Sequence, residues 1–404
     1  MSAPATLRIA LVGGPMYDGL YGTIPHFARA HNVRVEIAAQ LPHPELNAFV
    51  KHAFESGMAL DAISTHTKYA PSQAHWLRPL DDLLSAELIN DLLPRPAELS
   101  RIDGQLLQVP RNLDVRLLHY RRDLIETPPR TWHDLMREAV DVTLTYRNRA
   151  TPLYGFLFPG RDSGLFGMFY ELLTAAGGRL FDDDLQPAFD SQPGRWAVEE
   201  IVEMHQHHRI TPRDLETWHY DDISASFRAG EAAMVSDWPG SYHLYRDPST
   251  CAVVDRVALA LLPKGPAGIR AAYAGCHSFA MTRATRHPEL VAALMTHLTS
   301  FQSQLDEARQ GAIPCRSSAL AEVRSEAAGD PAAATRWALL AETETTMIIP
   351  PRFAAYPQCE DAIWRNVQHA MLGELDAAAA VHRAAAEIEA IIAGHLPVHA
   401  REQA

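Results

Sequence analysis

The chain has 404 residues, enough for two or three domains of ordinary size, and 47% hydrophobic with 21% charged residues is the composition of a globular protein with a large core. A small scaffold that depends on disulfides is excluded. Acidic residues outnumber basic ones 49 to 36, giving a formal net charge of −13, and no run of Lys or Arg occurs. This balance argues against nucleic acid or an anionic membrane as partner.

The first part of the chain alternates strand-like and helix-like segments. Leu7–Val12 predicts a strand, about Gly22–His31 a helix and Val33–Ala38 a second strand. A helix over roughly Glu45–Ser56 then leads to a third strand at Ala62–Ser64. This order is a βαβ arrangement and predicts an α/β fold.

The loops after the first and third strands are the first candidates for a binding site. They cover Gly13–Tyr21 and Thr65–Tyr69. In open α/β sheets ligands bind outside the carboxyl ends of the strands, so both loops belong to one rim of the predicted sheet.

The middle of the chain changes character and predicts a second lobe. Aromatic and Gly-rich loops are expected at Tyr154–Phe169, Trp218–Tyr220 and Asp237–Tyr245, between helices such as Arg195–His208. A strand, a helix and an Ala-rich tail of one or two exposed amphipathic helices are expected further on, at Ser278–Met281, Pro288–Ser300 and about 362–394. Because no flexible linker occurs, the lobes are expected to be joined by more than one ordered crossing, which favours a hinge.

The N-terminus and the cysteines carry few signals. Met1–Thr6 lacks the basic and apolar stretches of a secretory signal, so the sequence as given predicts no export address. No stretch approaches the roughly 18 apolar residues of a transmembrane helix. The four cysteines are far apart without a C-x-x-C pair, which implies neither a metal site nor a disulfide framework: Cys251, Cys276, Cys315 and Cys359. Pairing of Cys276 with Cys315 remains open.

Familiar enzyme signatures are absent from the sequence. It contains no G-x-S-x-G, Walker A, G-x-G-x-x-G or H-E-x-x-H motif. His205, His207 and His208 point in different directions on a helix and lack a carboxylate partner, so a solvated helix end is expected. The acidic run Asp182–Asp184 is interpreted as a turn rather than a cation site. No catalytic residue and no metal site is predicted.

Aromatic side chains are frequent in polar, Gly- or Pro-containing segments. A sugar ring offers C–H faces for stacking and hydroxyls for hydrogen bonding, so flat rings beside polar groups favour a polyhydroxylated ligand. The residues concerned are Trp76, Tyr154, Trp238, Tyr242, Phe353, Tyr356 and Trp364. For any single ring, a place in the core is the alternative.

Six phrases, in the same order along nearly the whole chain, resemble extracellular solute-binding protein family 1. These are the carbohydrate-binding proteins of ABC importers, to which the maltose-binding protein is related. The phrases are Trp76–Leu83 (WLRPLDDL), Asp103–Pro110 followed by Leu117–Leu124, Pro129–Leu135, Leu173–Asp182, Phe227–Met234 followed by Trp238-Pro239, and Pro351–Tyr356.

The resemblance implies a type II periplasmic-binding-protein fold: two α/β lobes joined by a multi-segment hinge, with the ligand cleft between them. Residues 1–112 and 276–316 would form lobe one, and residues 113–275 and 317–404 lobe two. The crossings are expected at Asn112–Val115, Tyr273–Cys276 and Pro314–Ser317. The implied function is to bind a sugar or sugar derivative, without cofactor or catalysis, and to deliver it to ABC permease subunits. A monomer, periplasmic or extracellular in its mature form, is expected.

Carried over residue by residue, the resemblance gives a list of candidate ligand-binding residues. These are Tyr17, Asp18, His66, Thr67, Lys68, Arg111, Asp114, Arg161, Asp162, Trp238, Tyr242, His277, Arg352 and Tyr356. The chain departs from the family at Gly275-Cys276-His277, where many members carry an aromatic residue. Since cations outnumber carboxylates in the list, an anionic sugar derivative such as a sugar acid, phosphate or sulfonate is the alternative ligand. Internal pairing of those charges around a neutral sugar is the competing interpretation.

Two functions of other classes remain open. The same bilobal scaffold also suits a cytoplasmic enzyme or sensor, because fold does not fix function. A polysaccharide-processing enzyme would need two carboxylates at a working separation, for which Asp18 and Asp114 are the conceivable pair.

Overall fold

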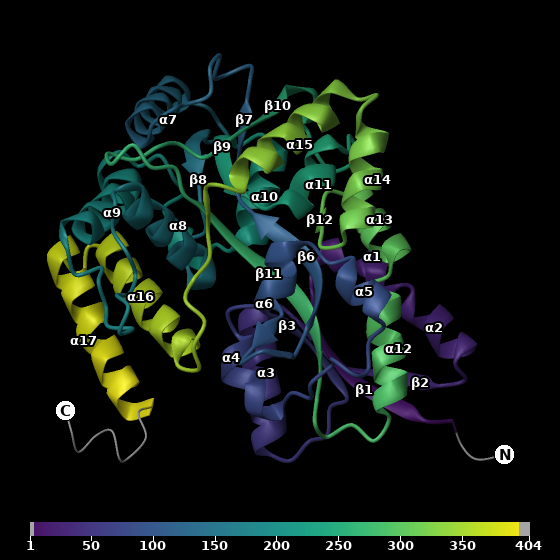
Figure 1. Ribbon diagram of the computed structural model, residues 1–404. Coiled ribbons are helices and arrows are strands. Elements are labelled where there is room, and N and C mark those ends of the chain that lie inside the picture. The colour runs from purple at the N-terminus through teal and green to yellow at the C-terminus, as the bar shows by residue number, and fades with distance from the viewer. Residues whose placement is uncertain (1–3, 396–404) are drawn as a thin grey trace. The chain divides into compact units, whose positions relative to one another are not determined.

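The computed structural model describes residues 4–395, which divide into two compact units (Figure 1). Unit 1 comprises the chain up to Asp114, Gly275–Ala334 and Arg352–Ala354, and unit 2 comprises Val115–Ala274, Thr335–Pro351 and the chain from Ala355 onward. The chain thus changes unit after Asp114, Ala274, Ala334, Pro351 and Ala354. The lobe boundaries and crossings expected from the sequence stay a prediction.

Unit 1 is built on a mixed sheet with the strand order β12-β6-β11-β3-β1-β2. The strands are β1 (Thr6–Val12), β2 (Arg34–Leu41), β3 (Ala62–His66), β6 (Val109–Val115), β11 (Ala272–Met281) and β12 (Ile313–Pro314). β1 pairs in parallel with β2 and β3, whereas β11 runs antiparallel to β3 and places His277 opposite His66. β11 begins in unit 2, where its first residues pair with β13 (Met347–Ile348).

Helices cover this sheet and complete the core of unit 1. They are α1 (Asp18–Tyr21), α2 (Ile24–Ala30), α3 (His43–Glu55), α4 (Ala70–Gln73), α5 (Ala86–Asn90), α6 (Pro94–Leu99), α12 (Pro288–Leu298), α13 (Phe301–Arg309) and α14 (Ser317–Ala327). A small hairpin, β4 (Arg101–Ile102) and β5 (Gln105–Leu106), precedes β6. Ile9 and Ile63 of the central strands and Leu46 and Val50 of α3 are almost fully buried, as the spacing of apolar residues predicts.

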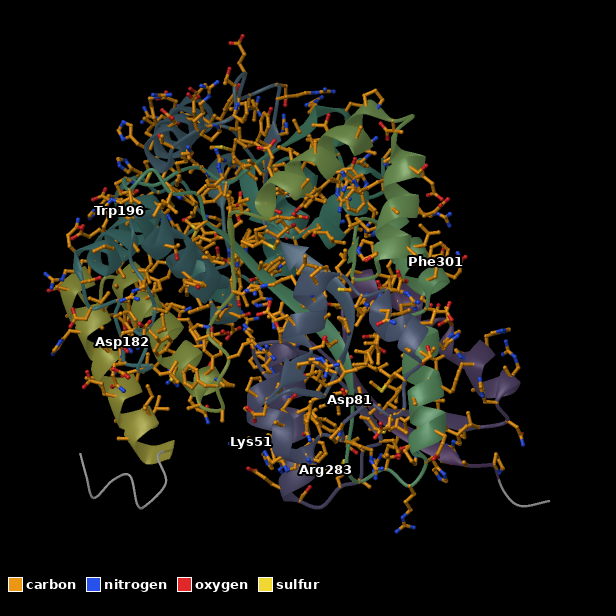
Figure 2. The ribbon with its side chains drawn as sticks, viewed as in Figure 1. Lys51, Asp81, Asp182, Trp196, Arg283 and Phe301 are labelled. Atoms are coloured by element: carbon orange, nitrogen blue, oxygen red, sulfur yellow. The ribbon has the colours of Figure 1, made fainter. Side chains whose placement is uncertain are left out.

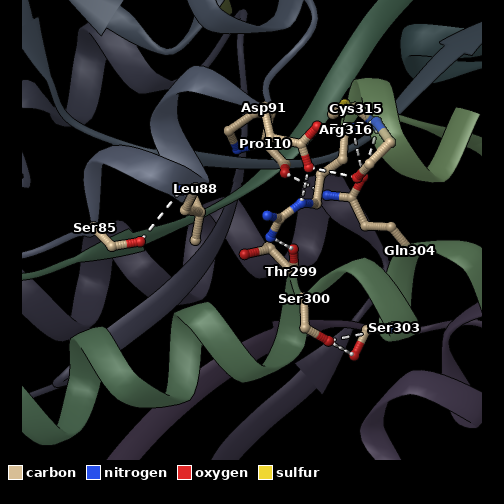
Figure 3. A network of polar contacts seen from close by, with 11 residues as sticks. Ser85, Leu88, Asp91, Pro110, Thr299, Ser300, Ser303, Gln304, Cys315 and Arg316 are labelled. Atoms are coloured by element: carbon tan, nitrogen blue, oxygen red, sulfur yellow. Dashed lines mark hydrogen bonds and ion pairs between the residues drawn. The ribbon is translucent and has the colours of Figure 1, made fainter.

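A polar network fastens the end of β12 to α13 within unit 1 (Figure 3). The Oε1 atom of Gln304 accepts hydrogen bonds from the backbone N–H groups of Cys315 (2.7 Å) and Arg316 (2.9 Å), and its Nε2 donates to the carbonyl of Pro110 (3.1 Å). The Arg316 side chain donates to Asp91 at 2.7 Å. These bonds satisfy buried backbone groups that the short strand leaves unpaired.

Unit 2 is built on a four-stranded sheet with the order β10-β7-β9-β8. The strands are β7 (Leu117–Arg121), β8 (Tyr154–Leu157), β9 (Ala232–Asp237) and β10 (Val257–Ala260). Its helices are α7 (Trp132–Tyr146), α8 (Asp162–Ala175), α9 (Gln192–Val202), α10 (Tyr220–Ala229), α11 (Tyr242–Arg246), α16 (Tyr356–Met371) and α17 (Ala377–His395), and α15 (Pro331–Thr343) contains the change of unit at Ala334. Figure 1 shows α16 and α17 side by side in yellow.

Two expectations about unit 2 are wrong. The segment Tyr154–Phe169 is not a loop, because it forms β8 and the first half of α8. Glycine is required at two positions of α8 because neighbouring side chains fill the space. A Cβ at Gly164 would lie 2.3 Å from Pro159, and a Cβ at Gly167 would lie 2.5 Å from Arg116. The segment Asp237–Tyr245 is not a loop throughout, because Pro239–Ser241 is a 3-10 turn and Tyr242–Arg246 is α11. The tail does form amphipathic helices, and one face of α16 is buried.

Two polar clusters are accounted for by local hydrogen bonds. His207 contacts Glu203 at 2.9 Å, and His205 contacts Thr211 at 2.8 Å. Asp182, labelled in Figure 2, accepts the backbone N–H groups of Asp184 (3.0 Å) and Gln186 (2.8 Å), the geometry of the expected turn. Between residues 4 and 395, no group of His, Cys, Asp and Glu side chains is arranged to hold a metal ion. Within the same range, no helix has the length and apolar character needed to cross a membrane.

Candidate functional site

The polar residues of unit 1 gather where its parallel strands end. Tyr17 follows β1, His43 follows β2 and His66 is the last residue of β3. Because β11 is antiparallel to β3, it brings His277 to the same edge, in register with His66. This is the edge at which open α/β sheets bind ligands.

A hydrogen-bonded chain of one carboxylate and two histidines runs through this edge. The Nε2 atom of His277 lies 2.9 Å from Oδ2 of Asp114, and its Nδ1 lies 2.8 Å from Nε2 of His43. A carboxylate only accepts, so His277 donates to Asp114 from Nε2. The second hydrogen bond joins Nδ1 of His277 to Nε2 of His43, and the tautomers of the two rings set which of them donates.

His66 packs edge-on against this chain, with its ring centroid 5.1 Å from that of His277. Burial, together with the neighbouring His277, Lys68 and His43, holds the pKa of His66 well below its ordinary value, so the ring is neutral near pH 7. Its Nδ1 accepts the backbone N–H of Lys68 at 3.3 Å. The ring occupies the space beside Gly275, where a Cβ would lie only 2.2 Å from its Nε2 atom. The unusual Gly-Cys-His sequence thus accommodates two histidine rings.

Arg111 supplies a charged group that is already paired. Its guanidinium donates to both carboxylate oxygens of Glu307, one contact measuring 3.1 Å, and lies 4.4 Å from the centroid of the Tyr17 ring. Burial opposes its charge, but the Glu307 carboxylate more than compensates, so the pKa of Arg111 is raised. Within residues 4–395, its buried Nη1 atom has no hydrogen-bond partner. One donor of this guanidinium therefore remains for a ligand oxygen.

Three other predicted residues of unit 1, Thr67, Lys68 and Arg352, lie near this cluster, and Asp18 does not. Arg352 donates to the backbone carbonyls of Thr67 (3.4 Å) and Arg101 (2.9 Å), and the Lys68 ammonium lies 4.8 Å from the centroid of the Tyr69 ring. Asp18 is exposed on α1. The structure thus brings most of the predicted residues of unit 1 into one connected cluster and leaves Asp18 at its surface.

The thiols of Cys276 and Cys315 also lie in unit 1. Their sulfur atoms are 3.7 Å apart, and both cysteines are buried and form no disulfide bond. Burial, followed by the contact with Cys276, raises the pKa of the Cys315 thiol well above its ordinary value. The Cys315 thiol is therefore protonated near neutral pH and poorly reactive.

In unit 2, Trp238 is the centre of an aromatic cluster. It follows β9, is half-buried, and its ring centroid lies 5.3 Å from that of Tyr220 and 5.7 Å from that of Tyr273. The buried Arg116 guanidinium lies 5.0 Å from its ring. The backbone N–H of Trp238 donates to Asp237 at 2.7 Å, which fixes the chain at the end of the strand.

The other predicted residues of unit 2 occupy different settings. Arg161 and Asp162 form an ion pair at 3.2 Å where α8 begins. Tyr242, the first residue of α11, stacks with the Arg336 guanidinium at 4.7 Å. Tyr356 is fully buried in α16, and its hydroxyl donates to Glu360 at 2.7 Å.

Several central residues are missing from the predicted list. His43 is the clearest omission, because the rule that selected the loops after the first and third strands applies equally after the second. Tyr220 lies in an expected aromatic loop and Tyr273 in an expected crossing, but neither residue was selected, and Arg116 directly follows another expected crossing. Glu307 is an acidic residue on a helix surface in sequence terms, and only the fold brings it to Arg111.

Comparison with known proteins identifies the class to which this arrangement belongs. The family model of bacterial extracellular solute-binding proteins matches residues 23–335. The chain belongs to this family, which confirms the resemblance recognised in the sequence.

Two curated relatives are ABC-transporter and sugar-alcohol binding proteins. A probable ABC transporter-binding protein of Deinococcus radiodurans is 24% identical over 241 residues, covering 58% of this chain and 57% of its own. A mannitol-binding protein of Pseudomonas aeruginosa is 24% identical over 238 residues, covering 56% of this chain and 52% of its own. The matches thus span little more than half the length of these relatives.

Solved structures confirm the predicted fold class. The maltose-bound MalE3 of T. maritima superimposes with a TM-score of 0.86 at 24% identity, covering 96% of this chain and 100% of that one. A ribitol complex of a solute-binding protein from Agrobacterium radiobacter gives 0.82 at 19% identity, covering 97% and 100%. The chain therefore has the type II periplasmic-binding-protein fold.

Proposed function

We propose that the protein is the substrate-binding component of an ABC importer and that it takes a neutral sugar or sugar alcohol. Family membership supports the binding role, and the relatives named for maltose, mannitol and ribitol support the class of solute. Delivery to permease subunits outside the cytoplasm, as a monomer, belongs to the same proposal. Closure of the two units about the crossing segments stays a prediction.

The observation that carries the choice of a neutral ligand is the pairing of the cations. Arg111 is bound by Glu307, Arg161 by Asp162, and Arg352 donates to two carbonyl groups. An anionic ligand would have to compete with these internal acceptors. Hydroxyl groups can instead use the remaining Nη1 donor of Arg111 and the polar chain from His43 to Asp114 without displacing any ion pair.

A thermal-shift screen tests the binding role and the ligand class together. Maltose, mannitol and ribitol are compared with gluconate and glucose 6-phosphate, since a ligand that binds only the native state raises the melting temperature. Titration calorimetry then measures affinity for each compound that gives a shift. Tighter binding of the acidic compounds would overturn the neutral assignment, and no shift with any compound would count against a sugar-binding role.

Trp238 provides a test at the level of one residue. We expect Trp238→Ala to weaken binding of the sugar found in the screen by ten-fold or more, about the contribution of one stacked ring. The matched control is Trp196→Ala, since Trp196 is a half-buried tryptophan on α9 of the same unit (Figure 2). Equal affinity of the wild type and the Trp238 variant in calorimetry would remove Trp238 from the site.

A further inference from the structure

Unit 2 contains a fully buried arginine that is enclosed by aromatic rings. Arg116 lies between β6 and β7, and its guanidinium carbon is 5.0 Å from the ring centroid of Trp238, 5.3 Å from that of Tyr273 and 5.4 Å from that of Tyr220. All three distances are within the range of a cation–π contact, which strengthens when the charge is removed from water.

Polar contacts fix the guanidinium in this position. Nη1 donates to Glu171 at 3.2 Å, and Nη2 donates to the carbonyl of Gly164 (3.1 Å) and to the hydroxyl of Tyr220 (2.7 Å). Burial opposes the charge, but Tyr220 and Glu171 more than offset it, so the pKa of Arg116 is raised and the group stays charged. The other oxygen of Glu171 accepts the backbone N–H of Tyr273 at 2.8 Å, so one carboxylate orients both Arg116 and β11.

The helix beside Arg116 is shaped to receive it. A Cβ at Gly167 of α8 would lie 2.5 Å from Nη2 of Arg116 and 2.6 Å from the ring of Tyr273. Any side chain at this position would displace the guanidinium. The glycine, the acid and the aromatic rings therefore form one site that is filled by a side chain of the protein itself.

We propose that Arg116 is a positioning residue for ligand binding: its planar guanidinium holds the Trp238 ring in the orientation that stacks on the sugar. This rests on the proposed function, in which Trp238 contacts the ligand. Arg116 is fully buried whereas Trp238 is half-buried, so Arg116 acts through the ring. Lysine cannot replace it, because an ammonium group is compact and lacks the flat, delocalised surface that stacks on rings.

The test uses two variants that keep the buried charges balanced. Arg116→Lys retains a cation for Glu171 and removes the planar stack, and the double variant Arg116→Met with Glu171→Gln removes the ion pair as a whole. The matched control is Arg149→Met, which removes an exposed arginine stacked on Tyr146 at 4.3 Å in the same unit. Calorimetry with the sugar from the screen measures affinity, and near-ultraviolet circular dichroism reports the packing of the tryptophan rings.

We expect both Arg116 variants to bind the sugar about 3- to 30-fold more weakly than the wild type, the range of a desolvated cation–π contact, while the control keeps its affinity. In a Trp238→Ala background the same substitutions should cost no further affinity, and their effect on the dichroism spectrum should disappear. A purely structural role would give additive losses in both backgrounds, and that result would overturn the proposal. If no sugar binds the wild type, the proposed function fails, and the Trp238-dependent change in dichroism alone decides whether Arg116 positions the ring.

Discussion

The contact between Gly275 and His66 makes a sharp prediction for Gly275→Ala. The added Cβ would lie 2.2 Å from Nε2 and 2.3 Å from Cε1 of His66, whereas ordinary contacts begin at 3.4 Å. The backbone of Gly275 lies in β11 and has no positive φ, so alanine is conformationally acceptable there. Any effect of the substitution is therefore steric and acts through the imidazole ring.

The size of the effect follows from how little space surrounds that ring. To restore contact distance His66 must move by about 1 Å, in a core packed as densely as an organic crystal. The rings of His277, His43 and Tyr69 surround it, with centroids at 5.1, 5.8 and 6.2 Å. Overpacking of this kind costs about 1–3 kcal/mol. For a domain of this size we expect the melting temperature to fall by about 2–12 °C.

The assay is thermal and urea unfolding, both followed by circular dichroism, with Gly329→Ala as the control. A Cβ at Gly329 meets nothing within 4 Å, and its φ is also ordinary, so that variant should be as stable as the wild type. His66→Ala removes the ring, and in this background Gly275→Ala should cost little. A Gly275→Ala protein as stable as the wild type, or one whose loss persists without the His66 ring, would refute the reasoning.

Two further predictions concern buried charge in unit 2. Glu171→Gln leaves the Arg116 cation without its carboxylate and should lower the free energy of unfolding by about 3–5 kcal/mol in urea titrations. The control Glu326→Gln breaks an exposed ion pair and should change the free energy of unfolding little. Burial, followed by the charge of Arg336, lowers the pKa of His119 to about 3, so the unfolded chain takes up a proton below pH 6.5 that the folded state excludes. The stability contributed by neutral His119 is then present above pH 6.5 and is lost as the pH falls. Between pH 7 and pH 5 the free energy of unfolding of the wild type should fall by about 2 kcal/mol more than that of His119→Gln. Parallel pH profiles of the two proteins would contradict this assignment.

The sequence predicts the fold well where apolar spacing is regular. The opening strands and helices lie within a few residues of their predicted positions, because the apolar run of β1 and the apolar face of α3 are visible in the sequence. The first half of α8 was missed because Gly164 and Gly167 are typical of loops, and only the tertiary contacts of Pro159 and Arg116 explain them. Local helix propensity does not include contacts with residues that are distant in the sequence.

For the candidate site too, some residues could be predicted from the sequence and others could not. Tyr17 and His66, which follow or end parallel strands, lie at one edge of the sheet because topology fixes where those ends meet. Their contact with a ligand stays a prediction. The partners that neutralise the cations, Glu307 and Glu171, could not be found, because each lies on a helix far along the chain from the arginine that it binds. Counting charges in the sequence therefore does not reveal that Arg111 is already paired with a carboxylate.

Under the proposed function, an acidic protein binds an uncharged solute, and paired arginines leave no local excess of charge beside it. Two buried arginines, Arg111 and Arg116, each lie against a buried glutamate, so neither pair contributes net charge to the ligand. Unit 1 offers the polar chain from His43 to Asp114 and the Nη1 atom of Arg111, and unit 2 separately offers the half-buried ring of Trp238. A site built to hydrogen-bond hydroxyls discriminates strongly against an analogue that lacks one, because its own buried groups are then left unpaired. We therefore expect two calorimetric measurements to differ. Removing one hydroxyl from the sugar should lower its affinity more than adding 0.5 M salt lowers the affinity of the intact sugar, because salt screens only the interactions between exposed charges.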